Sequence, residues 1–251
     1  MPSHRYPLEK RDALSNISFT IERGDRIFLF GLNGAGKTTT LNLLGLLETL
    51  RNGRILYYDT KDKEWNYREI SRAESQRIRK NFSFLIQDPQ LLHYFSGWEN
   101  VMQSLILQGI SPHDAWNSCE KVLEELFKNE ENGKELVIKN SPEVSGGQRQ
   151  KFALARAIIR KADIFFVDEI RTCLDIKNAA TVIQYFKKYL DERQNTDNPA
   201  TLILVSHNYQ DAFDLGVTRF FHLHDGVLDE LTATSADALY ALQQSYTKRS
   251  L

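Results

Sequence analysis

The chain has 251 residues, 41% of them apolar and 26% charged, and its 32 lysines and arginines nearly balance its 33 acidic residues. These values are typical of a globular protein with enough sequence for one large domain or two small ones, and the balanced charge gives no reason to expect nucleic acid as a partner. No apolar stretch is long enough for a membrane-spanning helix, and the first residues lack the apolar segment of a signal peptide, so we expect a cytoplasmic protein.

The N-terminal residues predict a strand that precedes the first glycine-rich loop. Ile17, Phe19 and Ile21 alternate with polar residues, which is the period of a half-buried strand, and a turn follows at residues 24–25. We therefore expect an antiparallel strand here. Tyr6 lies further upstream, and as an aromatic residue it has two interpretations: it stacks on a nucleotide base, or it covers the sheet near the end of the chain.

Residues 31–39 lie between an apolar strand at 27–30 and an apolar helical segment at 41–47. This order of strand, glycine-rich loop and helix favours a phosphate-binding loop over an ordinary surface loop, because backbone N–H groups and a helix N-terminus can surround an anion. Lys37 can reach the β- and γ-phosphates of a nucleotide, and the Thr38 hydroxyl can ligate Mg²⁺. The predicted phosphate-binding residues are Gly31, Leu32, Asn33, Gly34, Ala35, Gly36, Lys37, Thr38 and Thr39.

The stretch after this loop predicts a strand at 53–59, a charged region with a helix around 68–80, and a buried strand at 82–86. Gln87 follows directly after the last of these strands. A polar side chain at the carboxyl end of a strand in an α/β sheet points into the ligand crevice. Taken alone, however, this position of Gln87 is unremarkable.

Residues 88–143 predict an inserted helical lobe, because glycines and prolines separate segments with helical spacing. An irregular segment at its start carries five large side chains in eight residues: Leu91, Leu92, Tyr94, Phe95 and Trp98. Two interpretations remain open. The cluster is either a surface that docks a partner through exposed aromatic residues, or the packed core of the lobe.

Residues 144–148, Val-Ser-Gly-Gly-Gln, open a further helix. A serine followed by two glycines at a helix start provides a second anion-binding N-terminus, with the hydroxyl and backbone N–H groups facing outward. Ser145, Gly146, Gly147 and Gln148 are therefore candidate phosphate ligands. Two such helix ends in one chain indicate a shared site.

Two more buried strands end in ionisable side chains. Residues 164–169 finish in Asp168 and Glu169, of which the first can hold Mg²⁺ and the second can orient and deprotonate an attacking water. Residues 201–206 are followed by His207, which we assign to the same site because three other strand ends or loops already converge on phosphate.

The C-terminal part holds two histidines and a helical tail. His222 and His224 lie two apart on one strand, and with no third ligand nearby we interpret them as part of a solvent-facing strand before a turn at 225–226, not as a metal pair. Residues 234–247 predict a short helix whose Leu239, Leu242 and Tyr246 pack on the core.

Assembled in this order, these motifs resemble the ATP-binding cassette (ABC) family along nearly the whole chain. The matches are residues 31–39 with Walker A, Gln87 with the Q-loop, 144–148 with the LSGGQ signature, 164–169 with Walker B, 172–175 with the D-loop, and His207 with the H-loop. The signature beside Walker B is specific to this family. Residues 91–101 are similar to the group that serves lipoprotein release, cell-division signalling and macrolide efflux; the alternative is a general importer or exporter ATPase.

The sequence departs from the family pattern at two places near the motifs. Val144 replaces the usual leucine of the signature, a change of one methylene that we expect to be tolerated. Ile170 and Arg171 stand where the family usually has Pro-Thr, so we expect the backbone there to be less fixed. Neither change removes a catalytic group, and we expect an active ATPase.

The resemblance implies an α/β fold of the ABC type of P-loop NTPase, with a mainly parallel core sheet, an antiparallel β-subdomain and an inserted helical subdomain. We expect one domain over residues 1–251, with the nucleotide-binding core at 1–87 and 144–228, the helical subdomain at 88–143 and a helical tail at 229–251.

The resemblance further implies a dimer, with an identical second chain as the simplest case, that holds ATP and Mg²⁺ between Walker A of one chain and the signature of the other. In that reading Glu169, His207 and Gln87 are catalytic, Thr38, Gln87 and Asp168 hold the metal, and Asp175 joins the nucleotide-binding residues. The expected partner is an integral membrane permease, with the chain on the inner face of the cell membrane. Two alternatives are a soluble ABC ATPase outside transport, as in iron–sulfur assembly, and a nucleotide-dependent scaffold without turnover.

Overall fold

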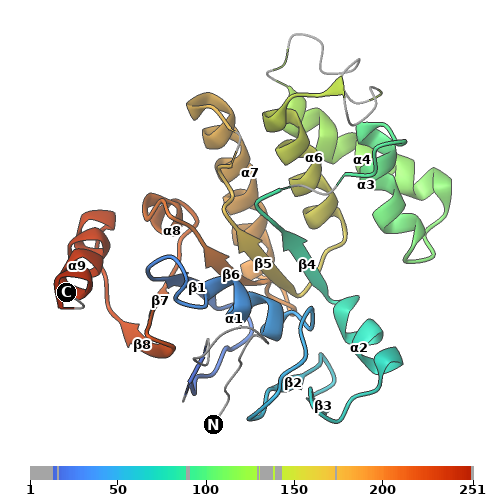
Figure 1. Ribbon diagram of the computed structural model, residues 1–251. Helices are drawn as coiled ribbons and strands as arrows, with labels where there is room; N and C mark the ends of the chain where they lie inside the picture. The colour runs from blue at the N-terminus through green and yellow to red at the C-terminus, as the bar shows by residue number, and fades with distance from the viewer. Residues whose placement is uncertain are drawn as a thin grey trace.

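The computed structural model describes residues 14–15, 17–88, 91–128, 130, 138, 143–172 and 174–249, and for 246–249 only the backbone. Figure 1 shows its central feature, a six-stranded sheet. In spatial order its strands are β4 (Phe82–Leu85), β5 (Ile164–Asp168), β6 (Thr201–Val205), β1 (Arg26–Phe30), β7 (Arg219–His224) and β8 (Val227–Leu231). Neighbouring strands pair in parallel except β7 with β8, as the family resemblance predicts.

Helices cover both faces of this sheet, and a two-stranded antiparallel sheet of β2 (Leu56–Tyr58) and β3 (Glu64–Asn66) lies beside it. The helices are α1 (Lys37–Leu44), α2 (Arg72–Arg79), α3 (Gly97–Ile106), α4 (Pro112–Phe127), α6 (Gly146–Ile159), α7 (Ile176–Gln194), α8 (Gln210–Asp214) and α9 (Ala236–Arg249). Within the described ranges, we find no helix with both the length and the apolar character that crossing a membrane requires.

The side chains of β1 divide between two hydrophobic clusters, one on each face of the sheet. Phe28 and Phe30 contribute to the cluster under α6 and α7, whereas Ile27 and Leu29 contribute to the cluster under α1. This follows from the alternation of side chains along a strand. Because β1 is buried on both faces, its sequence is a continuous apolar run after Arg26, which is typical of a central parallel strand.

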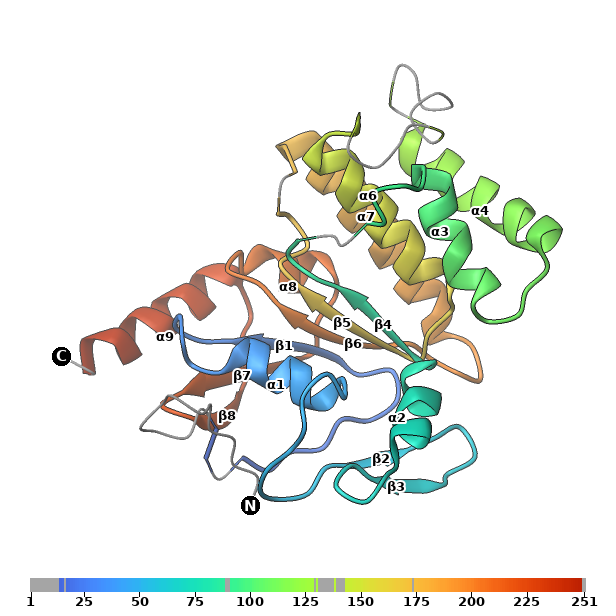
Figure 2. The same cartoon turned by 45° about the vertical axis from the view of Figure 1, so that its right-hand side comes forward.

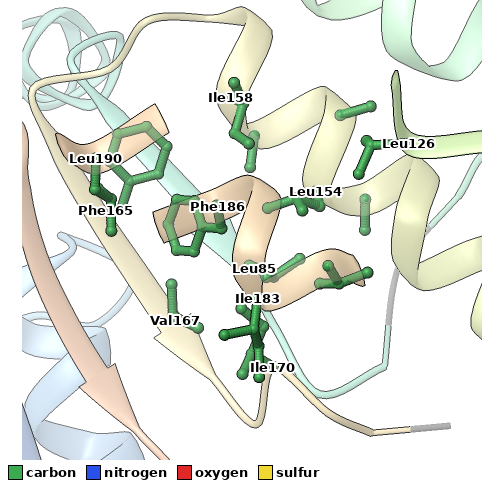
Figure 3. Packing of buried hydrophobic residues seen from close by; sticks show 14 of the residues in the cluster. Leu85, Leu126, Leu154, Ile158, Phe165, Val167, Ile170, Ile183, Phe186 and Leu190 are labelled. Atoms are coloured by element: carbon green, nitrogen blue, oxygen red, sulfur yellow. The ribbon is translucent and has the colours of Figure 1, made fainter. Parts of the chain in front are cut away.

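The larger cluster joins the sheet to the helices of its upper face in Figure 2. Figure 3 shows Phe165 and Val167 of β5 close to Phe186 of α7, with Leu154 of α6 beside Phe186. Full burial of such side chains stabilises the fold by about 1.5–3 kcal/mol each. The sheet and α6 therefore form one packed unit.

The predicted helical lobe is present as α3 and α4, which pack on α6 (Figure 2). Both helices begin at serine N-caps, Ser96 and Ser111, whose side chains accept backbone N–H groups three residues on. The five-residue cluster at the start of the lobe is divided. Leu91 and Trp98 are buried, Phe95 is half-buried, and Leu92 and Tyr94 are exposed, Tyr94 by 97%.

The prediction of an antiparallel strand around Ile17, Phe19 and Ile21 is wrong. Residues 17–22 show the expected alternation, with Ile17 buried and Phe19 and Ile21 half-buried, but the segment forms no ladder with a strand in the described part of the chain. Its apolar side chains cover the cluster under α1, while β2 pairs with β3 instead. A cavity of about 1020 Å³ lies between this segment, β2 and the sheet. Periodicity therefore predicted burial correctly and pairing incorrectly.

The C-terminal hairpin differs from the prediction in two respects. His222 is fully buried, with its ring 4.9 Å from that of Phe30, so its strand does not face solvent. Strand β8 continues to Leu231, so a boundary at residue 228 cuts through it. Asp225 and Gly226 both have positive φ, as a two-residue hairpin turn requires. The predicted tail helix is α9, and its Leu239 is buried as expected; the side chain of Tyr246 lies outside the described residues.

Gly97, the first residue of α3, provides a test of this packing. An added methyl group there would overlap the ring of Phe152 on α6. We expect Gly97→Ala to lower the free energy of unfolding by about 1–3 kcal/mol, because overpacking forces the two helices apart. Thermal unfolding followed by circular dichroism measures the change. Glu120→Ala, on the exposed side of α4, is the control; equal stability of the two variants would contradict this packing.

Candidate active site

Four neighbouring strands, β4, β5, β6 and β1, run parallel and therefore present their carboxyl ends at the same edge of the sheet. Gln87 follows β4, Asp168 ends β5, His207 follows β6, and the glycine-rich loop follows β1. The register aligns these ends, since Val205 of β6 lies opposite both Asp168 and Leu29. These segments line a cavity of about 270 Å³.

The loop after β1 has the backbone geometry that phosphate binding needs. Gly34 and Gly36 have φ values of 80° and 101°, a conformation that favours glycine. At Gly31 a side chain would overlap the carbonyl oxygen of Leu223 on the neighbouring β7. Helix α1 then begins at Lys37, so its N-terminus faces the cavity with the partial positive charge of the helix dipole.

Lys37 lies inside this loop and is almost fully buried. Its Nζ donates to the carbonyl oxygens of Gly31 and Leu32, both at 2.9 Å. Burial lowers the pKa of Lys37, and the nearby carboxylates of Asp168 and Glu169 oppose that shift. The loop therefore holds the Lys37 ammonium group at the cavity wall, where its positive charge would balance a bound phosphate.

Asp168 and Thr38 face one another across the cavity. The Thr38 hydroxyl donates to Oδ2 of Asp168 at 3.4 Å. Burial raises the pKa of Asp168, opposed by this hydrogen bond and by Lys37. Within the described residues no group of three or more histidine, cysteine or acidic side chains could hold a metal ion. A hydroxyl and one carboxylate suit Mg²⁺, which usually binds one or two carboxylates and completes its shell with phosphate and water.

Glu169 has a backbone conformation that is uncommon for a residue with a side chain, with a φ of 59°. Its N–H donates to Val205 O, and its carboxylate accepts the backbone N–H of His207 at 2.8 Å. The His207 ring lies with Nε2 3.6 Å from the same oxygen. Burial raises the pKa of Glu169, which the adjacent His207 opposes. A raised pKa brings a carboxylate nearer to the range in which it accepts a proton efficiently.

Most of the site residues that the sequence predicts in the glycine-rich loop and at the strand ends line this cavity. Its lining contains Asn33, Gly34, Gly36, Lys37, Thr38, Thr39, Gln87, Asp168, Glu169 and His207, together with Val205, which the sequence did not single out. Gly31, Leu32 and Ala35 belong to the same loop without lining the cavity. Val205 gave no signal in the sequence, because it is one apolar residue of a buried strand.

The signature residues and Asp175 do not reach this cavity within the described chain. Ser145, Gly146, Gly147 and Gln148 form the start of α6, where Ser145 and Gln148 exchange the two hydrogen bonds of a capping box. Asp175 accepts the backbone N–H of Asn178 and so caps α7. Tyr6 lies outside the described residues, so its two interpretations stay open.

The expectation of a less fixed backbone at Ile170 and Arg171 is wrong. Ile170 is fully buried, and its carbonyl accepts a hydrogen bond from Gln150 of α6 at 3.2 Å. Arg171 forms ion pairs with Asp211 and Asp214 of α8. Packing and charge pairing therefore replace the restriction that a proline would impose. The unusual arginine was visible in the sequence, but its partners lie 40 and 43 residues away.

Residues 14–172 match a family model described as ABC transporter. The chain belongs to the ABC transporter family. It is an ATP-binding cassette that hydrolyses ATP.

The cassette is similar to proteins of several transport systems. It is 31% identical to the lipoprotein-releasing system ATP-binding protein LolD of Rickettsia typhi, over 86% of this chain and 88% of that protein. It is 32% identical to the macrolide export ATP-binding/permease protein MacB of Mannheimia succiniciproducens, over 86% of this chain and 31% of that longer protein. These relatives assign it to the lipoprotein-release and macrolide group of ABC ATP-binding subunits.

Solved structures agree on the fold. The ATP-binding cassette MJ0796, as a dimer in a post-hydrolysis state bound to ADP and Pi, superposes with a TM-score of 0.77 at 24% identity, covering 93% of this chain and 97% of that one. The cbiO1 protein of Clostridium perfringens gives a TM-score of 0.72 at 21% identity, covering 98% of this chain and 91% of that one. The cassette therefore has the ABC ATPase fold.

Proposed function

We propose that this cassette works as a dimer with two ATP molecules between the protomers and drives a separate membrane permease. The observation that carries the proposal is the arrangement of the two helix starts that the sequence predicts to bind phosphate. The start of α1 lines the cavity with the catalytic candidates, whereas the start of α6 does not. A second copy could bring its own Ser145-Gly146-Gly147 over the open side of the cavity.

In the proposed reaction Glu169 accepts a proton from the water that attacks the γ-phosphate, and His207 and Gln87 contact that phosphate. Thr38, Asp168 and Gln87 would hold Mg²⁺, which when bound neutralises charge on the β- and γ-phosphates. Lys37 contributes a positive charge at the same place. The hydrogen bond from the His207 backbone to Glu169 orients the carboxylate at the cavity.

Replacing Glu169 by glutamine tests this assignment. Glu169→Gln keeps the size of the side chain and loses the proton acceptor, so we expect ATP turnover to fall roughly 10²–10⁴-fold, about 2.7–5.4 kcal/mol of barrier. ATP binding should persist because the loop at 31–39 is unchanged. Phosphate release and the affinity for a fluorescent ATP analogue measure the two effects. Turnover within threefold of the wild-type value, in a folded protein, would refute the role of Glu169.

The proposed dimer gives a different prediction for a substitution in the signature at Ser145. In Ser145→Arg the added bulk and charge should prevent closure of the dimer, so ATP-dependent dimerisation and turnover should fall while the isolated chain still binds ATP. Size-exclusion chromatography with ATP, in the background of Glu169→Gln to prevent hydrolysis, measures dimerisation. Loss of ATP binding by the monomeric variant would contradict the arrangement between two chains.

The permease part of the proposal is supported by the relatives and by the surface of the helical lobe. LolD is named as part of a lipoprotein-releasing system and MacB as an export ATP-binding/permease protein. On this chain Leu92 and Tyr94 are exposed at the start of the lobe, beside Gln87 in the sequence. Movement at the nucleotide could reach a permease through this segment, with the cassette on the inner face of the cell membrane. Trp98, in contrast, is buried, and its ring packs at a tilt against that of Trp116 with the ring centroids 4.1 Å apart.

Docking through Tyr94 gives a separate prediction. Tyr94→Ala should weaken association with the permease by about 1–3 kcal/mol, because exposed aromatic residues are common interface anchors. Basal ATPase activity and melting temperature should stay near the wild-type values. Co-purification from detergent-solubilised membranes measures association, with Tyr240→Ala on α9 as the control for removing an exposed tyrosine. Unchanged permease recovery with Tyr94→Ala would exclude this docking site.

A further inference from the structure

Arg171 connects the segment after the catalytic strand to helix α8. Its side chain is 27% exposed and donates through Nε to Asp211 and through Nη2 to Asp214, the latter at 2.6 Å. Asp211 is fully buried. A buried carboxylate is costly unless it is paired, so Arg171 compensates a charge that the fold has removed from water.

The second oxygen of Asp211 continues the connection toward the active site. Ser206, the residue before His207, donates its hydroxyl to Asp211 Oδ2 at 2.7 Å. The same hydroxyl accepts the backbone N–H of Asn208 at 3.0 Å. Ser206 therefore connects the backbone on the far side of His207, at Asn208, to the Asp211 carboxylate, which forms an ion pair with Arg171.

This chain of contacts closes on Glu169. The backbone N–H of His207 donates to the Glu169 carboxylate, and Glu169 is two residues before Arg171 in the sequence. Ile170 between them is buried and held by Gln150. Glu169 and His207 thus approach each other within a closed ring of contacts. Neither Arg171 nor Asp211 lines the cavity.

We propose that Arg171 is a positioning residue for ATP hydrolysis, acting through Asp211 and Ser206 to hold the His207 backbone on the Glu169 carboxylate. An arginine suits this role because its planar guanidinium can donate in two directions at once, here to two carboxylates of one helix. The inference rests on the proposed role of Glu169 as the general base.

The first test separates turnover from nucleotide binding. With Arg171→Ala we expect kcat for ATP to fall about 10-fold, because a small misplacement of the base slows the chemical step. KM and the affinity for a fluorescent ATP analogue should change less than about twofold, since the phosphate-binding loop is untouched. Arg219→Ala is the matched control: Arg219 is 25% exposed, pairs with Asp25 and Glu230, and lies at the start of β7 away from the cavity. Its kcat should stay within about twofold of the wild-type value.

The second test is a double-mutant cycle with Ser206. Ser206→Ala removes the hydroxyl that joins Asp211 to the His207 segment, so it should also lower kcat, and combining it with Arg171→Ala should cause little further loss. Arg171→Lys keeps one charged contact to Asp211 and should recover part of the activity. If Arg171→Ala does not fold, Ser206→Ala compared with Arg171→Lys provides the same readout.

Three outcomes would overturn the proposal: an unchanged kcat in folded Arg171→Ala, a parallel loss of kcat and nucleotide affinity in that variant but not in Arg219→Ala, or losses that multiply in the double variant. The result with Glu169→Gln distinguishes a failure of this proposal from a failure of the proposed ATPase mechanism. If Glu169→Gln retains turnover, the general base is wrong; if it loses turnover while the Arg171 and Ser206 effects multiply, only the positioning role is wrong.

Discussion

The parallel pairing of β4, β5, β6 and β1 is the constraint on which the active site depends. Parallel strands end at the same edge, so residues separated by up to 174 positions, from Asn33 to His207, line one cavity. Gln87 and His207 follow a strand and Asp168 ends one, whereas Lys37 and Thr38 open helix α1. If any of these strands shifted its register by one residue, its side chains would move to the other face of the sheet and a different residue would stand at the cavity.

Packing on the two faces of the sheet holds this edge still. The side chains of β1 alternate between the cluster under α1 and the cluster under α6 and α7, so the sheet cannot slide against either layer without losing buried apolar contacts. Helix α6 has a special position, because the signature opens it, it packs on β4 and α7, and its Gln150 donates to the Ile170 carbonyl. The signature and the contact to the residue that follows Glu169 therefore lie on one helix.

Burial also sets the electrostatics of the site. Lys37 is buried, and Asp168 and Glu169 are half-buried. This burial lowers the pKa of the lysine and raises the pKa of both carboxylates, while the charges of Asp168 and Glu169 oppose the shift of Lys37. The Asp211 carboxylate behind the site is buried in the same way, and there Arg171 provides the compensating charge. Two neighbouring clusters of buried charge thus share the segment from residue 168 to 171.

The sequence by itself determined the loop at 31–39, the strand ends at Gln87, Asp168 and His207, and the start of the signature helix, because each depends on local order of residue types. It also predicted the buried strands, whose apolar runs follow from burial on both faces. Tertiary structure alone decided which periodic segments find a partner. Residues 17–22 have the period of a strand and form no ladder with any described residue, whereas β3 and β8 pair. It likewise decided that Trp98 and His222 are buried and that Arg171 finds Asp211. Burial, strand pairing and ion pairing bring together residues that are far apart in the chain. The local sequence around each residue does not specify which distant residue it contacts.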